Sequence, residues 1–286
     1  MSFRTVVVKE RCKLDLKLNY LVCRKDDEQR IYLPEISYLI IESTAVSLTS
    51  ALLCELVKNN VKVIFCDEKH NPISELIPLY GVHNSSKRIK EQLSWKEETK
   101  GVIWKTIIKD KILKQREILI KNKLSIEADM LLGYASEVLP FDESNREGHS
   151  AKVYFNALFG KEFIRQSDSF HSNCLNYGYT ILLSCFNREI TKSGYLTQLG
   201  IWHKNEFNQF NLSSDLMEPF RPLIDRLVLG LKENEDFKEK ILEIFKLQIR
   251  INDKLVFFEN AISIYTQSVF NALENDDESL VLSYEL

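Results

Sequence analysis

Glycine is scarce in this sequence and is missing from its first eighty residues. Only nine glycines occur among the 286 residues, and the first of them is Gly81. Phosphate-binding loops of nucleotide-binding proteins need glycines between a strand and a helix, because the backbone there must approach the phosphate closely. The N-terminal part of the chain therefore contains neither a P-loop nor a dinucleotide-binding turn.

The sequence also lacks paired metal-binding residues and long apolar runs. None of the six cysteines forms a C-x-x-C pair, and the five histidines show neither H-x-x-x-H nor H-E-x-x-H spacing. We interpret the cysteines as buried thiols, and a zincin is not supported. No segment approaches about 18 consecutive apolar residues. The N-terminal residues MSFRTVVVKER are charged where a signal peptide is apolar, so the sequence predicts a cytoplasmic protein with no membrane partner.

An overall positive charge is absent as well, but the charges are unevenly distributed. The formal net charge is −3. Residues 86–123 nevertheless hold 12 Lys and Arg against 5 Asp and Glu, whereas residues 274–286 hold 5 acids and no base. A local basic face is sufficient for phosphate contacts. We therefore predict that Lys87, Arg88 and Lys90 contact DNA. The acidic end is expected to face a protein partner or solvent.

The residue pattern predicts an α+β protein with two domains. Candidate strands cover residues 3–8, 13–24, 31–43 and 61–67, and a helix is expected over 49–60, capped by Ser47 or Thr49. Proline and glycine in the segment HNPISELIPLYGVHNSS indicate a boundary. Beyond it the pattern is helical almost throughout. The prediction is a small β-rich domain over residues 1–80 and a larger all-helical domain over residues 81–286.

The segment SNREGHSAKVYFNALFG places a carboxylate on an apolar helical stripe. Ser144 or Asn145 can cap this helix, and Glu147 aligns with the apolar side chains that follow at helical spacing, while His149 falls on the opposite side. A buried carboxylate needs a cation, a partner or a proton. The alternative is an ordinary acid in a first helical turn, favoured by the helix dipole.

A second acidic segment, NLSSDLMEPFRPLIDRLVLGL, combines charge with two prolines. Its polar side chains fall on one helical face, and Pro219 and Pro222 cannot donate backbone hydrogen bonds, so the backbone is expected to be irregular near Glu218. Taken alone, the segment also fits a solvated amphipathic helix. His203, in LGIWHKNEF, is compatible with a structural histidine or with a ligand.

Four segments in this order resemble the CRISPR adaptation integrase and endonuclease family. They are REGHSAKVYF (146–155), LNYGY (175–179), the region around His203, and SSDLMEPFRP (213–222). The last of these is the most specific. The stretch PISELIPLYG (72–81) is similar to the type II-A subtype. The resemblance covers essentially the whole chain.

Membership in that family implies a catalytic metal site made of Glu147, His203 and Glu218 in the helical domain. Some relatives carry Asp at the last position. Two carboxylates and one imidazole suit Mg²⁺ or Mn²⁺. Arg146, Arg165 and Arg221 are additional candidates for DNA contacts around the metal, and Asp215 could support a second ion or orient the first.

The resemblance also implies the activity and the partners. The activity is insertion of DNA fragments as new spacers into a CRISPR array, by attack of the fragment's 3′-hydroxyl on the repeat. The expected partners are double-stranded DNA, a second copy of the chain bound through the β-rich domain, a small dimeric subunit that completes a heterohexamer, and the type II effector nuclease.

Two other functions stay open from the residues alone. A non-catalytic DNA-binding scaffold requires only the basic region. A metal-independent helical ribonuclease would use the R-x5-H spacing of Arg165 and His171.

Overall fold

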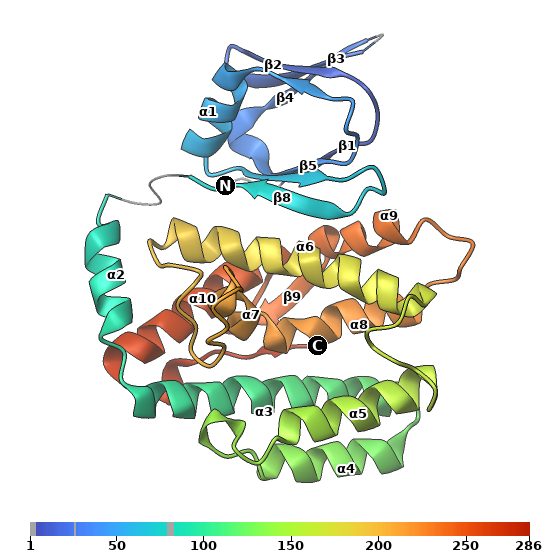
Figure 1. Cartoon of the computed structure of the whole chain (residues 1–286), viewed down its shortest axis with the longest axis vertical. Coiled ribbons are helices and arrows are strands. Elements are labelled where there is room, and N and C mark those ends of the chain that lie inside the picture. Colours follow the sequence, from blue (N-terminus) through green and yellow to red (C-terminus); the bar gives the residue numbers. More distant parts are fainter. Residues whose placement is uncertain (1–3, 26, 79–82) are drawn as a thin grey trace. The chain divides into compact units, whose positions relative to one another are not determined.

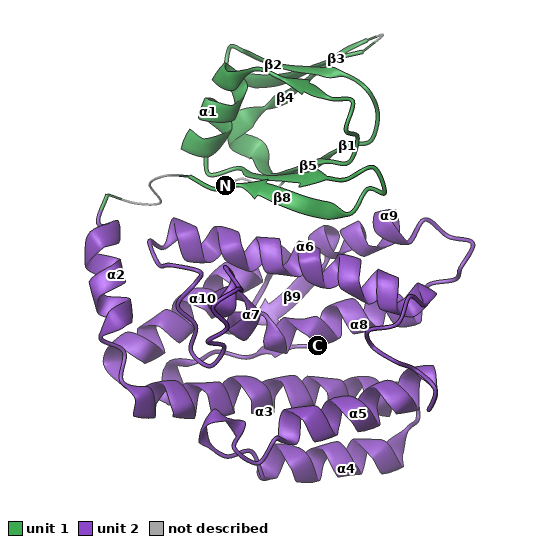
Figure 2. Cartoon of the chain, viewed as in Figure 1, with its two compact units in different colours: residues 1–83 green, residues 84–286 purple. Residues whose placement is uncertain are grey.

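The computed structural model describes residues 4–25, 27–78 and 83–286 (Figure 1). The chain forms two compact units, residues 1–83 and 84–286 (Figure 2). The predicted domain boundary after residue 80 lies outside the described residues. The α+β class is confirmed, because strands dominate the first unit and helices the second.

The described residues of the first unit form two four-stranded sheets and one α-helix. One sheet has the order β1-β5-β7-β8, formed by Arg4–Val8, Ile36–Ile41, Lys62–Cys66 and Pro72–Leu76. Its first three strands are parallel and β8 is antiparallel to β7. The second sheet has the order β4-β3-β2-β6, formed by Glu28–Tyr32, Tyr20–Arg24, Lys13–Lys17 and Ser47–Leu48. Helix α1 (Ser50–Lys58) begins after Thr49, whose side chain accepts a hydrogen bond from the Leu52 amide, as predicted.

Two of the predicted strands are interrupted by turns. Residues 13–24, predicted as one strand, form the hairpin β2–β3. Leu18 and Asn19 have φ angles of 49° and 63°, and two consecutive positive φ angles are typical of a type I′ hairpin turn. The pattern conceals this turn, because the apolar alternation of Leu14 and Leu16 continues to Leu18, which lies in the turn itself. The second prediction, residues 31–43, is divided between β4 and β5 by the 3-10 turn η1 (Leu33–Glu35), which contains Pro34.

The second unit is built on two long helices. Helix α3 (Glu97–Lys121) packs against α4 (Ser125–Ser136) and α5 (Arg146–Phe159). Helix α6 (Phe170–Lys192) contacts α7 (Asn211–Leu216), α8 (Arg221–Leu229), α9 (Phe237–Leu242) and α10 (Phe258–Asn275). Helix α2 (Ser85–Leu93) precedes α3. None of the described helices combines the length and hydrophobicity required to cross a bilayer.

The prediction of an all-helical second domain is wrong. Strands β9 (Gln248–Ile251), β10 (Lys254–Phe257) and β11 (Tyr284–Glu285) form a sheet of order β10-β9-β11. Asn252 and Asp253, between β9 and β10, have φ angles of 50° and 58°. The residues QIRINDKLVF therefore make a tight hairpin, since Asn and Asp tolerate the left-handed conformation.

The interpretation of the cysteines as buried thiols holds for most of them. Cys12, Cys66, Cys174 and Cys185 are buried, and Cys23 is partly buried. Cys54 is exposed on α1, so the prediction is wrong there.

Candidate metal centre

Glu147 lies in the first turn of α5. The side chain of Asp142 accepts hydrogen bonds from the backbone amides of Arg146 and Glu147, at 2.8 and 2.9 Å. Asp142 therefore caps the helix; Asn145 occupies the cap position with φ 50° but makes no such bond. The cap fixes the direction in which the Glu147 side chain leaves the helix, and 36% of that side chain is exposed.

Glu218 lies in a break between two helices. Helix α7 ends at Leu216, and a 3-10 turn, η3 (Glu218–Phe220), connects it to α8. This confirms the irregular backbone predicted from the two prolines. The interpretation as a solvated face is wrong, because Asp215, Glu218 and Asp225 are all buried.

Lys111 joins the two glutamates. Its Nζ lies 2.5 Å from Oε1 of Glu147 and 2.5 Å from Oε2 of Glu218. Arg221 binds the other Glu218 oxygen, at 2.9 Å. The positive charge of Lys111 lowers the pKa of Glu147 in spite of its burial. Burial alone would lower the pKa of Lys111, but the two carboxylates outweigh it and the pKa is raised.

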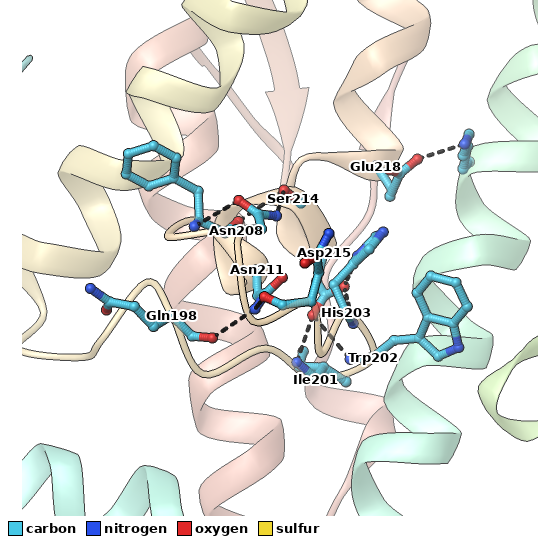
Figure 3. Close-up of polar contacts among 12 residues, drawn as sticks. Gln198, Ile201, Trp202, His203, Asn208, Asn211, Ser214, Asp215 and Glu218 are labelled. Carbon is cyan, nitrogen blue, oxygen red and sulfur yellow. Dashed lines mark hydrogen bonds and ion pairs between the residues drawn. The ribbon is translucent and has the colours of Figure 1, made fainter. Parts of the chain in front are cut away.

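His203 is held by Asp215, as Figure 3 shows. Asp215 is fully buried and accepts the backbone amides of Ile201, Trp202 and His203 at 2.6, 3.0 and 3.2 Å. Its Oδ1 also lies 2.5 Å from Nδ1 of His203. A carboxylate accepts hydrogen bonds, so Nδ1 carries the proton and Nε2 keeps its lone pair as a potential metal ligand. Burial raises the pKa of Asp215, although these hydrogen bonds oppose the shift.

The loop before His203 requires a glycine. A Cβ atom at Gly200 would lie 2.4 Å from the His203 carbonyl oxygen and 2.7 Å from Oδ2 of Asp215. Only the absence of a side chain allows the loop to wrap so closely around the carboxylate.

The donor set suits a divalent cation, although its members are not gathered around one point. In the part of the chain that the structure describes, no three His, Cys, Asp or Glu side chains are grouped closely enough to hold a metal. Glu147 and Glu218 do converge, however, and a cation, the Lys111 ammonium, lies between them. His203 lies close enough that an imidazolium there would lower the pKa of Glu147. Two convergent carboxylates and an oriented imidazole are ligands appropriate for Mg²⁺ or Mn²⁺.

A basic cleft adjoins this carboxylate pair. It has a volume of about 310 Å³ and is lined by Glu147 together with the cationic side chains Lys111, Lys152, Arg165 and Arg221. The Arg165 and Arg221 guanidinium carbons lie 4.9 and 4.8 Å from the ring centre of Tyr179, which also lines the cleft. The cleft therefore offers positive charge beside the carboxylates, which suits the phosphates of a nucleic-acid strand.

Known proteins are similar in sequence to this chain over most of its length. Residues 5–256 match the family of the CRISPR associated protein Cas1. The chain belongs to the Cas1 family. The CRISPR-associated endonuclease Cas1 of Neisseria meningitidis serogroup C (strain 8013) is 34% identical over 242 residues, which are 84% of this chain and 80% of that protein.

Solved structures show that the chain shares the fold of the Cas1 family. A casposase bound to its integration product superposes with a TM-score of 0.77 at 19% identity, over 96% of this chain and 92% of the casposase. A chain of a Cas6-RT-Cas1–Cas2 complex also gives a TM-score of 0.77, at 20% identity. The match covers 98% of this chain but only 36% of the longer chain in that complex.

The other predicted DNA contacts lie outside the basic cleft. Arg146 pairs with Glu137 at 2.8 Å, and its guanidinium lies near the ring of Tyr134. Arg88 bonds to Glu91 and Glu274, at 3.1 and 2.6 Å. Lys87 and Lys90, also on α2, are exposed. Of these residues, Lys87 and Lys90 are therefore the most accessible to phosphate.

Lys111 is a site residue that the sequence pattern alone did not single out. It belongs to the basic segment 86–123, yet only 5% of its side chain is exposed. A signal was present, because Trp104, Ile108, Lys111, Gln115 and Ile118 recur at helical spacing and all are buried. A lysine at a core position of such a stripe indicates a buried partner of opposite charge.

Proposed function

We propose that this member of the Cas1 family is a divalent-metal-dependent DNA endonuclease and integrase that inserts DNA fragments as new spacers into a CRISPR array. The observation that carries the proposal is the convergence of Glu147 and Glu218 on one cationic position. The basic cleft beside them supplies space and charge for a DNA strand.

The chemistry follows from the donor set. Glu147, His203 and Glu218 would hold Mg²⁺ or Mn²⁺, and Asp215 keeps the imidazole in the orientation that frees Nε2. When bound, such an ion polarises a phosphodiester and stabilises negative charge on the leaving oxygen. In strand transfer the new P–O bond forms to the 3′-hydroxyl of the incoming DNA, and the bond to a 3′ oxygen of the target breaks. The nucleophile thus belongs to the substrate. The residues of the protein position the reacting groups and stabilise the charge that develops.

The assembly is part of the same proposal. A second copy of the chain and a small dimeric partner would form a heterohexamer on double-stranded DNA, with the type II effector nuclease as a further partner. The fold shared with a chain from a Cas6-RT-Cas1–Cas2 complex supports a partner of the Cas2 kind. The type II-A-like subtype and the cytoplasmic location stay predictions.

A first prediction tests the three ligands. Glu147→Gln, His203→Ala and Glu218→Gln should each reduce strand transfer at least about a hundred-fold, because each removes a ligand of the metal. The assay follows insertion of labelled DNA into a supercoiled repeat-containing plasmid with Mg²⁺ or Mn²⁺. Circular dichroism shows whether each variant is folded.

His149→Ala is the matched control. His149 lies on the same helix as Glu147 but is exposed, beside Arg146 and Tyr134. It should leave strand transfer unchanged. A Glu218→Gln protein that integrates at the wild-type rate would show that the site is wrongly assigned.

The same protein preparations distinguish the two alternative functions. A non-catalytic scaffold would keep all its function in the Glu147→Gln variant. A metal-independent ribonuclease would cleave RNA in EDTA through Arg165 and His171. In the structure Arg165 bonds to Asn176 at 2.8 Å, and the His171 ring packs against Phe159 and Phe170. The two residues of that motif thus have different partners.

A further inference from the structure

Lys111 occupies an unusual position for a lysine. It lies in the middle of α3, in a stripe whose other members fill the core of the unit, and it is almost completely buried. A buried ammonium is unfavourable unless it is paired. Both of its observed partners, at 2.5 Å, are carboxylates proposed here as metal ligands.

The charges around the two glutamates are already balanced. Glu147 and Glu218 carry two negative charges, and Lys111 and Arg221 carry two positive charges in direct contact with them. A divalent cation that binds both carboxylates would therefore meet a pair whose negative charge is already offset by its direct contacts. It would also have to take the place next to the Lys111 ammonium, since that group lies within 2.5 Å of an oxygen of each carboxylate.

We propose that Lys111 is a built-in counter-ion that competes with the divalent cation for Glu147 and Glu218. This inference rests on the proposed function, because it assumes that the two glutamates bind the metal. Without metal, the ammonium keeps the two carboxylates paired and close together. The cost is repulsion of the incoming metal ion, so the free protein binds the ion weakly.

The test is a titration with Mn²⁺ alone, in the absence of DNA. Binding to the full-length protein is measured by electron paramagnetic resonance of free Mn²⁺, for the wild type and for Lys111→Met. Methionine keeps most of the length of the lysine stem and removes the charge. We expect Lys111→Met to bind Mn²⁺ about ten-fold more tightly or better, because a like charge in direct contact with the ligands is gone.

Thermal unfolding gives a second measurement. In EDTA the midpoint of Lys111→Met should fall below that of the wild type, because Glu147 loses its cationic partner and the buried Glu218 keeps only Arg221. Saturating Mn²⁺ should raise the midpoint of the variant by more than that of the wild type. Lys111→Gln, whose amide still donates hydrogen bonds to the carboxylates, covers the case in which Lys111→Met does not fold, and it should shift both quantities in the same direction.

Lys114→Met is the matched control. Lys114 is equally buried one turn further along α3, but it pairs with Asp110 and Ser283 instead of with the two glutamates. Its Mn²⁺ affinity should equal that of the wild type. If the wild type binds Mn²⁺ and neither Lys111 variant binds it more tightly, the inference is overturned and the metal site stands. If no protein binds Mn²⁺ at millimolar concentration, the metal site itself fails and the inference falls with it.

Discussion

Asp225 is a carboxylate that the fold buries completely. It lies on α8, and its Oδ1 accepts a hydrogen bond of 2.5 Å from the hydroxyl of Tyr179 on α6. The two helices approach closely there, since a Cβ atom at Gly178 would lie 2.4 Å from Cγ2 of Ile224. Burial raises the pKa of Asp225 from 3.8 to about 6, although the hydrogen bond from Tyr179 opposes the shift.

This pKa predicts a pH dependence of stability. A carboxyl group whose pKa is higher in the folded state binds its proton more tightly there, so its contribution to stability is present at low pH and is lost as the pH rises through about 6. Between pH 4 and 7 the wild type should lose up to about 3 kcal/mol relative to Asp225→Asn. Urea denaturation of both proteins at several pH values, followed by circular dichroism, measures the difference. Parallel pH profiles would contradict the prediction.

Single residues show clearly where prediction from sequence stops. The family resemblance points to Glu147, His203 and Glu218, and the structure places the two glutamates around one lysine. The lysine itself is not found in this way, because a charge count treats all cations of a basic segment alike. Burial of Asp225 also escapes prediction, since helical spacing shows which residues share a face and does not show what packs against that face.

At the scale of elements, the strand β11 supports the turn that carries Glu218. The hydroxyl of Tyr284 donates a hydrogen bond of 2.8 Å to the carbonyl oxygen of Pro219, and its ring packs 4.6 Å from that of Phe220. A strand that comes from the acidic end of the chain thus stabilises the candidate metal centre. From the sequence we expected that end to face a protein partner or solvent, whereas Tyr284 is buried within the same unit.

Removal of the Tyr284 hydroxyl should destabilise this turn. Tyr284→Phe leaves a buried carbonyl group without its partner and should cost about 1 to 2 kcal/mol of unfolding free energy, measured in urea. Tyr265→Phe is the control, because the Tyr265 hydroxyl is buried with no hydrogen-bond partner among the described residues. Equal losses in the two variants would show that the bond to Pro219 contributes nothing.

Elements are predicted better where they are long than where they are short. The long helices beyond the domain boundary and the two-proline break were expected, because each has a strong local cause. The hairpins at Leu18–Asn19 and Asn252–Asp253 were missed, although the second is a recognisable turn sequence. In the first, leucine at a positive φ angle is unusual, and the apolar alternation of the first strand runs on into the turn at Leu18.

At the scale of the whole molecule, the proposed assembly predicts a dimer. Light scattering of the purified protein at micromolar concentration should give a mass close to twice 33.4 kDa. Dilution into the nanomolar range provides the control, since a specific dimer dissociates with a defined midpoint. A monomer at micromolar concentration contradicts the prediction.

The accessible lysines of α2 predict how DNA binding depends on salt. Reversing Lys87 and Lys90 to glutamate should weaken binding to all DNA sequences and should flatten the log–log salt slope by about 0.9 for each phosphate that the protein no longer binds. Arg88 is left unchanged, because it holds Glu274 within the unit. Fluorescence anisotropy of labelled DNA at several salt concentrations measures both quantities.

Lys240 and Lys246, which are also exposed, serve as the control pair for the same reversal. Charge reversal there should have a smaller effect on both quantities. If the α2 variant keeps the wild-type affinity and slope, the DNA path runs instead past Arg146, Arg165 and Arg221.

The stacked tryptophans beside His203 make the candidate metal centre observable without any label. The rings of Trp104 and Trp202 lie parallel, with centres 5.1 Å apart, and the His203 ring stands edge-on to both. The remaining tryptophan, Trp95, is buried against Tyr195 and Phe270. Trp202 is 43% exposed and adjacent in sequence to the proposed ligand. Its intrinsic emission should therefore respond when a paramagnetic ion or a nucleobase arrives, and stopped-flow quenching can time the loading of the site before any bond is broken.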